Sequence, residues 1–151
     1  MKKFLLCSNI GKGKTILNSF DSALLSSGVA NYNLVNVSSI LPPHAQQADK
    51  VDLPEGSILF TAYATKYTID KDVMISAAIA VGIPQNPNDI GVIMEFSSNI
   101  CANEAKKRVS EMVVEAMNNR GIEIKEILCK SAEAIGNGHE YVSVFAGLAM
   151  W

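Results

Sequence analysis

The sequence predicts a single domain of the α+β class. At 151 residues, with 48% hydrophobic and 19% charged residues, the chain is large and apolar enough to bury one core. Two helical patterns, one early and one late, are separated by runs of strand-like segments rather than alternating regularly with single strands. No apolar stretch approaches the ~18 residues that span a bilayer, which argues against an integral membrane protein.

The first part of the chain is predicted to be a strand, a loop and a helix. Lys3–Cys7 alternates weakly as a strand does, and Ser8–Lys14 contains two glycines, which favours a loop. A helix is expected to begin at Thr15 and to end before Gly28. Its apolar residues recur with a period of 3.6: Ile16, Leu17, Phe20, Ala23 and Leu24.

The middle of the chain is predicted to be extended. Asn31–Val37 alternates and runs through Ser38–Ser39 into the rigid Pro42–Pro43 pair. Ser57–Tyr67 and Val73–Val81 are rich in β-branched and small residues, as strands are. The remaining elements follow in order: a nearly apolar strand at Ile90–Phe96, a helix at Ala102–Asn119 that ends at Gly121, and strands at Ile122–Cys129 and Tyr141–Met150.

Composition narrows the possible functions. The three cysteines, Cys7, Cys101 and Cys129, form neither an even set nor a C-x-x-C pair, so we expect reduced thiols in a cytoplasmic protein. His44 and His139 lie far apart in the sequence without a second ligand at metal-binding spacing, so no metal is expected. The net charge of -2 gives no general attraction to nucleic acid.

One alternative is a nucleotide-binding domain. Ser8–Thr15 matches a phosphate-binding P-loop except that Ser8 stands where the first glycine belongs, and Glu95 could supply the acid that holds magnesium. Such a domain needs helices on both faces of a parallel sheet, and only two helices are predicted. This interpretation is therefore the weaker one.

Two further features carry possible chemistry. Glu95 lies in an apolar strand, so its carboxyl either faces water at the strand end or is buried with a raised pKa. Ser38–Ser39 is either an ordinary strand end before a proline turn, or a peptide bond held in a fixed geometry beside two hydroxyls that can react with it.

Five blocks in register over nearly the whole chain resemble the pyruvoyl-dependent arginine decarboxylases. The most specific is the pattern Asn-Leu-x-x-x-Ser-Ser-Ile-x-Pro-Pro, which begins at Asn33. The blocks are Asn18–Leu25, Asn33–Pro43, Thr61–Tyr63, Ile75–Ala78 and Gly91–Glu95.

This resemblance implies that the chain cuts itself between Ser38 and Ser39. The Ser39 hydroxyl attacks the Ser38 carbonyl, and the resulting ester breaks down to leave a pyruvoyl group in place of Ser39. A β chain of residues 1–38 and an α chain of residues 39–151 would result from one domain of residues 1–151. The implied reaction is decarboxylation of L-arginine to agmatine, with the pyruvoyl group as the electron sink and no external cofactor.

The resemblance also implies roles for site residues and an assembly. Glu95 would reprotonate the substrate's α-carbon, Asn33 would lie near the processing bond, and Asp21 would pair with the guanidinium group. Family members are trimers with active sites between subunits, built from stacked, mainly antiparallel sheets flanked by helices. Lys14 is an unexpected cation in the first loop that would disfavour a guanidinium group, so another amino-acid substrate remains an alternative. A family member that does not process itself is a further alternative.

Overall fold

The computed structural model describes residues 1–151 and contains nine strands and two helices. The elements, in chain order, are β1 (Lys3–Gly13), α1 (Ile16–Ser26), β2 (Asn33–Asn36), β3 (Ile40–Leu41), β4 (Gln46–Gln47), β5 (Ile58–Thr68), β6 (Met74–Pro84), β7 (Gly91–Ser98), α2 (Ala102–Asn118), β8 (Ile124–Ile135) and β9 (Tyr141–Met150).

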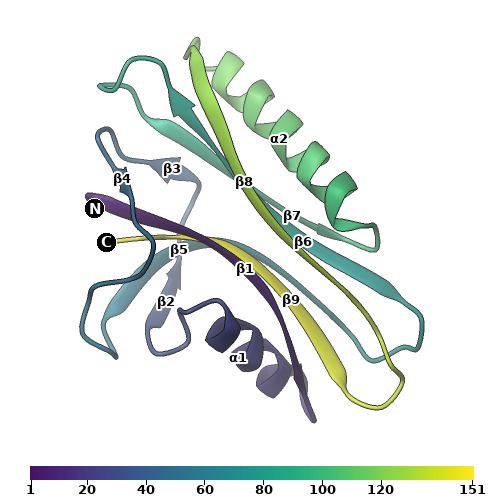
Figure 1. Ribbon diagram of the computed structural model, residues 1–151. Coiled ribbons are helices and arrows are strands. Elements are labelled where there is room, and N and C mark those ends of the chain that lie inside the picture. Colours follow the sequence, from purple (N-terminus) through teal and green to yellow (C-terminus); the bar gives the residue numbers. More distant parts are fainter.

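The strands form two stacked sheets with one helix on each outer face (Figure 1). The five-stranded sheet has the order β2-β5-β9-β1-β4, and the four-stranded sheet has the order β3-β7-β6-β8. Only the short pairs β1–β4 and β2–β5 are parallel. Helix α1 packs on the five-stranded sheet and α2 on the four-stranded sheet. The predicted α+β class, with stacked and mainly antiparallel sheets flanked by helices, is confirmed.

The main core lies between the two sheets, because alternate side chains of each strand point to that side. Strands β6 and β9 are buried almost throughout, since a helix covers the face that the opposite sheet leaves free. The largest fully buried side chains of this inner layer are Ile75, Ile79, Val81, Ile93, Leu148 and Met150.

Strand β1 corrects one prediction. Ser8–Lys14 was predicted to be a loop, but β1 continues to Gly13 and pairs with β9 without a break. Gly11 is needed for packing, because a Cβ at this position would lie 2.2 Å from the Ala23 nitrogen of α1. Because this segment's backbone belongs to a sheet, it does not form the phosphate-cradling loop that the P-loop interpretation requires.

Helix α1 starts where the sequence predicts it, with Thr15 as the N-cap that accepts a hydrogen bond from the Asn18 amide at 3.1 Å. The predicted apolar stripe is only partly buried. Ala23 is fully buried, but Leu17 is 74% exposed. Helix α1 therefore presents apolar surface to the outside of the chain.

The remaining elements agree with the predictions except in their extent. Helix α2 ends as expected, with Gly121 at φ +65 after it, and β8 runs six residues further than the predicted end at Cys129. The two-residue strands β3 and β4 were not predicted, because so short a segment shows no alternation. Neither helix has the length and apolar character needed to cross a bilayer.

Candidate active site

The Ser38–Ser39 peptide bond lies where the chain crosses from one sheet to the other. Strand β2 forms the edge of the five-stranded sheet, and β3 forms the edge of the four-stranded sheet. Only residues 37–39 connect the two strands. The side chain of Ser38 is exposed, whereas that of Ser39 is half-buried. The bond is therefore held at both ends and remains open to water.

A tight turn centred on Ser39 fixes this bond. The Ile40 amide donates a hydrogen bond to the Ser38 carbonyl oxygen at 3.0 Å, which closes a three-residue γ-turn. The φ of Ser39 is not positive, so the turn is the common inverse form, and all peptide bonds are trans. The carbonyl oxygen of Ser39 accepts a hydrogen bond from the Ile93 amide of β7 at 2.8 Å. The carbonyl oxygens of Ser38 and Ser39 thus each accept a hydrogen bond from a backbone amide.

The Ser39 hydroxyl faces a carboxylate on the neighbouring strand. Ser39 Oγ donates a hydrogen bond to Glu95 Oε2 at 3.2 Å. Glu95 lies two residues after Ile93 on β7, so its side chain points to the inner face of the four-stranded sheet. Burial raises the pKa of Glu95 above its ordinary value, and the hydrogen bond from Ser39 opposes that rise. This carboxyl can exchange a proton with a group at residue 39.

Asp21 and Asn33 lie together at a different place. Both line a hollow formed by α1, β2 and β5, and neither Ser39 nor Glu95 belongs to its lining. Asp21 is exposed, and the Asn33 side-chain amide donates to the Gly56 carbonyl oxygen at 2.7 Å. The other residues of the hollow are mostly apolar: Leu17, Phe20, Leu24, Ala30, Tyr32, Leu34 and Tyr63.

Within one chain, therefore, the predicted site residues form two groups. The processing group comprises Ser38, Ser39 and Glu95, and the second group, in the hollow, comprises Asp21 and Asn33. Lys14 belongs to neither. A carboxylate on a mostly apolar wall suits a cation on an apolar stem, while the processing group suits acyl transfer and proton transfer.

Comparison with known proteins assigns this arrangement to a family. Residues 3–150 match the sequence profile described as pyruvoyl-dependent arginine decarboxylase. The chain belongs to the pyruvoyl-dependent arginine decarboxylase family. Three curated relatives carry that name. The relative from Thermococcus kodakarensis is 41% identical over 87% of this chain and 84% of its own. The relative from Methanococcus aeolicus is 38% identical over 93% of this chain and 86% of its own. The relative from Methanocaldococcus jannaschii is 37% identical over 97% of this chain and 87% of its own.

The name of the pyruvoyl-dependent arginine decarboxylase family implies a pyruvoyl group, and the residues present fit such a group at position 39. A pyruvoyl group made from serine needs a hydroxyl that can reach the preceding carbonyl and a nearby group that handles protons. The γ-turn holds the Ser38 carbonyl next to Ser39, and the Ser39 hydroxyl contacts Glu95, which can exchange protons with it. No cluster of three potential metal ligands occurs in the structure.

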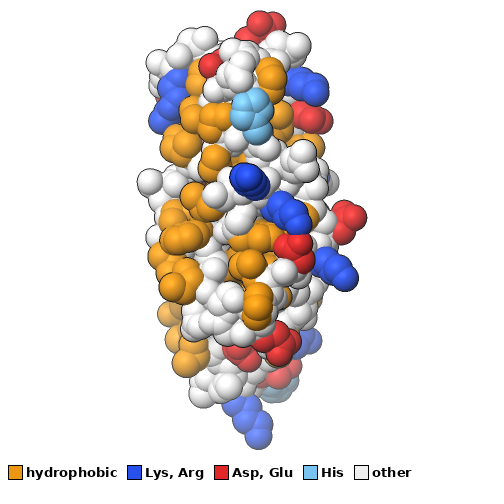
Figure 2. Space-filling model, turned by 90° about the vertical axis from the view of Figure 1, so that its left-hand side faces the viewer, with side chains coloured by type: hydrophobic (Ala, Val, Ile, Leu, Met, Phe, Trp, Pro, Cys, Tyr) orange, Lys and Arg blue, Asp and Glu red, His pale blue; other side chains and the backbone are white.

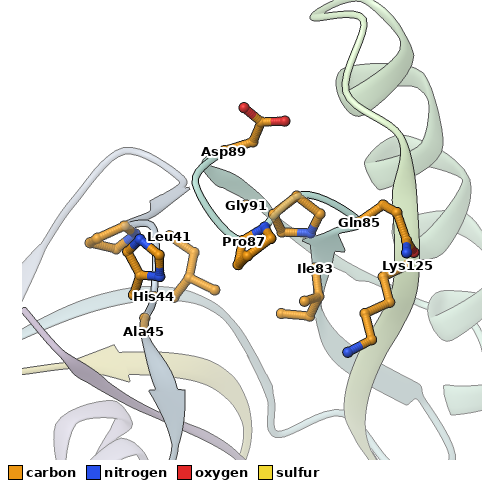
Figure 3. A pocket seen from close by; sticks show the side chains of 11 residues that line it. Leu41, His44, Ala45, Ile83, Gln85, Pro87, Asp89, Gly91 and Lys125 are labelled. Atoms are coloured by element: carbon orange, nitrogen blue, oxygen red, sulfur yellow. The ribbon is translucent and has the colours of Figure 1, made fainter.

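A separate hollow lies beyond β3 and is not part of the processing group. Its wall includes Leu41 and Gly91, which belong to the same strands as Ile40 and Glu95. Figure 3 shows His44 and Lys125 facing this hollow from opposite sides, while Asp89 points away from it.

Sequence reasoning missed two contacts at this bond, those of the Ile40 and Ile93 amides with the Ser38 and Ser39 carbonyl oxygens. Every residue except proline carries a backbone N–H, so the residue type gives no signal that a particular amide contacts a particular carbonyl. Only the turn at Ser39 and the pairing of β3 with β7 reveal these contacts.

Proposed function

We propose that this chain is a pyruvoyl-dependent decarboxylase that converts L-arginine to agmatine and carbon dioxide. The observation that carries the proposal is the contact of Ser39 Oγ with Glu95 beside an exposed Ser–Ser bond, in a chain of this family. The three relatives cited above are named as arginine decarboxylases.

The site is formed by self-cleavage between Ser38 and Ser39. Glu95 accepts the hydroxyl proton of Ser39, and Oγ attacks the Ser38 carbonyl carbon, so that the peptide bond is exchanged for an ester. Elimination then releases Ser38 as the carboxyl end of the β chain, residues 1–38. Hydrolysis of the unsaturated residue 39 releases ammonia and leaves the pyruvoyl group on the α chain, residues 39–151. The proposal is supported by the 3.2 Å distance between Ser39 Oγ and Glu95 Oε2.

Once formed, the pyruvoyl group supplies an electron sink for the electrons that carbon dioxide leaves behind. Glu95 then holds the proton that the substrate's α-carbon receives. Its raised pKa suits this role, because a carboxyl with a higher pKa carries a proton over more of the pH range. Residues of the inner layer around Glu95 shield it partly from water.

Arginine is favoured over other amino acids by the hollow that contains Asp21. A carboxylate binds a guanidinium group through two parallel hydrogen bonds, and the apolar wall suits the three methylene groups of the arginine stem. Lys14 is not among the lining residues, so it does not oppose a cation there. Asn33 lies on the same wall, five residues before Ser38 in the sequence.

The separation of the two groups supports a homo-oligomer, a trimer with active sites between subunits. Asp21 of one copy would then complete the site around Ser39 and Glu95 of another. Exposed apolar side chains support such contacts: Leu17 beside Asp21 is 74% exposed, and Ile58 is 59% exposed. Figure 2 shows hydrophobic side chains spread along one side of the surface. The three free cysteines support a cytoplasmic location.

Denaturing electrophoresis of the purified protein tests the first step. We expect two fragments, residues 1–38 and residues 39–151, and a single intact chain for Ser39→Ala. Ser26→Ala, in another Ser–Ser pair, is the matched control and should cleave normally. A folded wild-type chain that stays whole would identify a member that does not process itself.

Release of labelled carbon dioxide tests the substrate. Arginine should be decarboxylated in preference to lysine, ornithine, histidine and aspartate. A preference for lysine or ornithine would support a pyruvoyl-dependent decarboxylase with another substrate. Release of carbon dioxide from none of these amino acids would contradict the proposed function.

A further inference from the structure

Two backbone amides contact the two carbonyls on either side of the atoms that react during self-cleavage. The Ile40 amide donates to the Ser38 oxygen at 3.0 Å, and the Ile93 amide donates to the Ser39 oxygen at 2.8 Å. The first contact joins residues two apart, so it does not belong to the ladder between β3 and β7. Sheet formation alone therefore does not account for both donors.

We propose that these two amides act in different steps of self-cleavage. The Ile40 N–H stabilises the negative charge formed in the acyl shift, and the Ile93 N–H stabilises the negative charge formed in the elimination. This inference rests on the proposed function, because it concerns the reaction that creates the pyruvoyl group.

In the first step, Ser39 Oγ forms a bond to the Ser38 carbonyl carbon while its proton moves to Glu95. The π electrons of the carbonyl move onto the Ser38 oxygen, which becomes an oxyanion. The Ile40 N–H already points at that oxygen, as a donor must to stabilise such a charge without rearrangement. Collapse breaks the bond between the Ser38 carbon and the Ser39 nitrogen. That nitrogen takes the proton back from Glu95, so an ester and a free amine remain.

In the second step, the Cα proton of Ser39 is removed and the ester oxygen leaves Cβ with the Ser38 carboxylate. The electrons from the Cα–H bond pass through an enolate whose charge lies on the Ser39 carbonyl oxygen. The Ile93 N–H donates to that oxygen. Glu95, which is a carboxylate again after the first step, lies within hydrogen-bond distance of Oγ of the same residue and can accept the Cα proton.

Because the two donors are aimed at different oxygens, loss of each should block a different step. An amide can be exchanged for an ester by incorporating the α-hydroxy acid analogue of isoleucine, which replaces N–H with oxygen and keeps the side chain. The exchange is made separately at Ile40 and at Ile93. The same exchange with the leucine analogue at Leu41, the next residue of β3, is the matched control.

Wild-type and variant chains are followed from synthesis, with and without hydroxylamine, which cleaves the Ser38–Ser39 ester to leave an α chain that begins with serine. The Ile40 variant should form this ester about 10²-fold more slowly. Hydroxylamine also cuts the introduced ester after residue 39, so the readout is the absence of any fragment that begins with Ser39. The Ile93 variant should accumulate the ester, so that hydroxylamine releases a fragment with Ser39 at its amino end, as mass spectrometry would show. That fragment ends at residue 151, or at residue 92 where hydroxylamine has also cut the introduced ester. The Leu41 variant should process at nearly the wild-type rate.

The proposal is overturned if the Ile40 and Ile93 variants process as fast as the wild type, or if both are slow and neither accumulates ester. Each exchange is repeated in Ser39→Ala, which cannot react, to measure its effect on thermal unfolding alone. If the Ile40 ester does not fold, Ile40→Pro removes the same donor and should likewise leave no ester to trap. If the wild type never cleaves, the proposed function fails instead.

Discussion

At the scale of single residues, the central feature of the proposed function is that one carboxyl, that of Glu95, would serve two reactions. Glu95 contacts Ser39 Oγ in the uncleaved chain and would lie beside position 39 after cleavage. The first reaction needs the carboxylate as a proton acceptor, and the second needs the carboxylic acid as a donor. A group partly removed from water, with a pKa above its ordinary value, can supply both forms under mild conditions.

The two reactions should therefore depend on pH in opposite directions. Self-cleavage should speed up as the pH rises through the Glu95 pKa, because the proton acceptor forms. Decarboxylation should slow as the pH rises through the Glu95 pKa of the processed protein. That pKa should lie higher still, since the Ser39 hydroxyl that lowers it has been consumed. Rates of fragment formation and kcat, each measured against pH, test this expectation.

Glu95→Gln should slow self-cleavage, because its proton acceptor is lost. In the chains that do cleave, it should remove the fall of kcat with rising pH and lower kcat per cleaved chain by about 10²- to 10⁴-fold. Glu126→Gln, an exposed position on β8, is the control and should leave the profile unchanged. If kcat of Glu95→Gln still fell as the pH rose, another group would have to donate the proton to the substrate's α-carbon.

Asp21 should set the affinity for the guanidinium group. We expect Asp21→Asn to raise KM for arginine about 10- to 100-fold, with a smaller effect on kcat, because a charge-assisted contact far from the reacting carbon is lost. Asp49→Asn, which changes an exposed carboxylate outside the hollow, should leave KM unaltered. An unchanged KM in Asp21→Asn would place the guanidinium elsewhere.

At the scale of secondary-structure elements, hydrophobic pattern predicted both helices and the long strands, because these have enough residues to show a period. It could not predict β3, whose two residues are held by pairing with β7. The glycines of Ser8–Lys14 were misinterpreted, since a glycine that favours a turn and one that admits a neighbouring helix have the same sequence signal.

For the site, the apolar context of Glu95 left two interpretations open, a carboxyl facing water at the strand end or a buried one with a raised pKa, and the structure favours the second. The residues around Ser38–Ser39 were compatible both with an ordinary strand end and with a reactive peptide bond. Only the resemblance to a known family singled this pair out. The contact between Ser39 and Glu95 joins residues 56 apart, so no local pattern encodes their distance.

Gly11→Ala tests how α1 is seated on β1. Its Cβ would lie 2.2 Å from the Ala23 nitrogen and 2.4 Å from the Ser19 carbonyl oxygen, so backbone must move. We expect a loss of about 1–3 kcal/mol in the free energy of unfolding, measured in denaturant with Ser39→Ala as the background so that all chains stay whole. Lys12→Ala, at the adjacent exposed position, should change it little. Equal stability of both variants would contradict the packing role.

At the scale of the whole molecule, the two residue groups of one chain are expected to belong to two different active sites. Glu95 serves the site of its own Ser39, and Asp21 serves the site of a neighbouring copy. The exposed Leu17 lies one helical turn before Asp21, where a subunit contact would cover it. Burial of that apolar surface would stabilise the assembly that completes the site.

Co-expression of Asp21→Asn with Glu95→Gln tests this arrangement. Each variant alone should have little activity at low arginine concentration, but in random mixed trimers roughly one quarter of the sites would combine two unmodified halves. Activity should therefore reappear in the mixture. Co-expression of Asp21→Asn with a chain carrying both changes is the control and should restore none. Absence of recovery in mixed trimers verified by mass would show that both residues act within one chain.

The position of β1 has a consequence for the life of the cleaved protein. Ten residues of β1 pair with β9 inside the five-stranded sheet, so the fragment that the proposed cut would release would stay paired with the larger one. An intact precursor can refold as a single molecule. A cleaved protein that has been melted must instead find its missing piece by collision, so its recovery would depend on concentration and each mature copy would in practice be assembled only once.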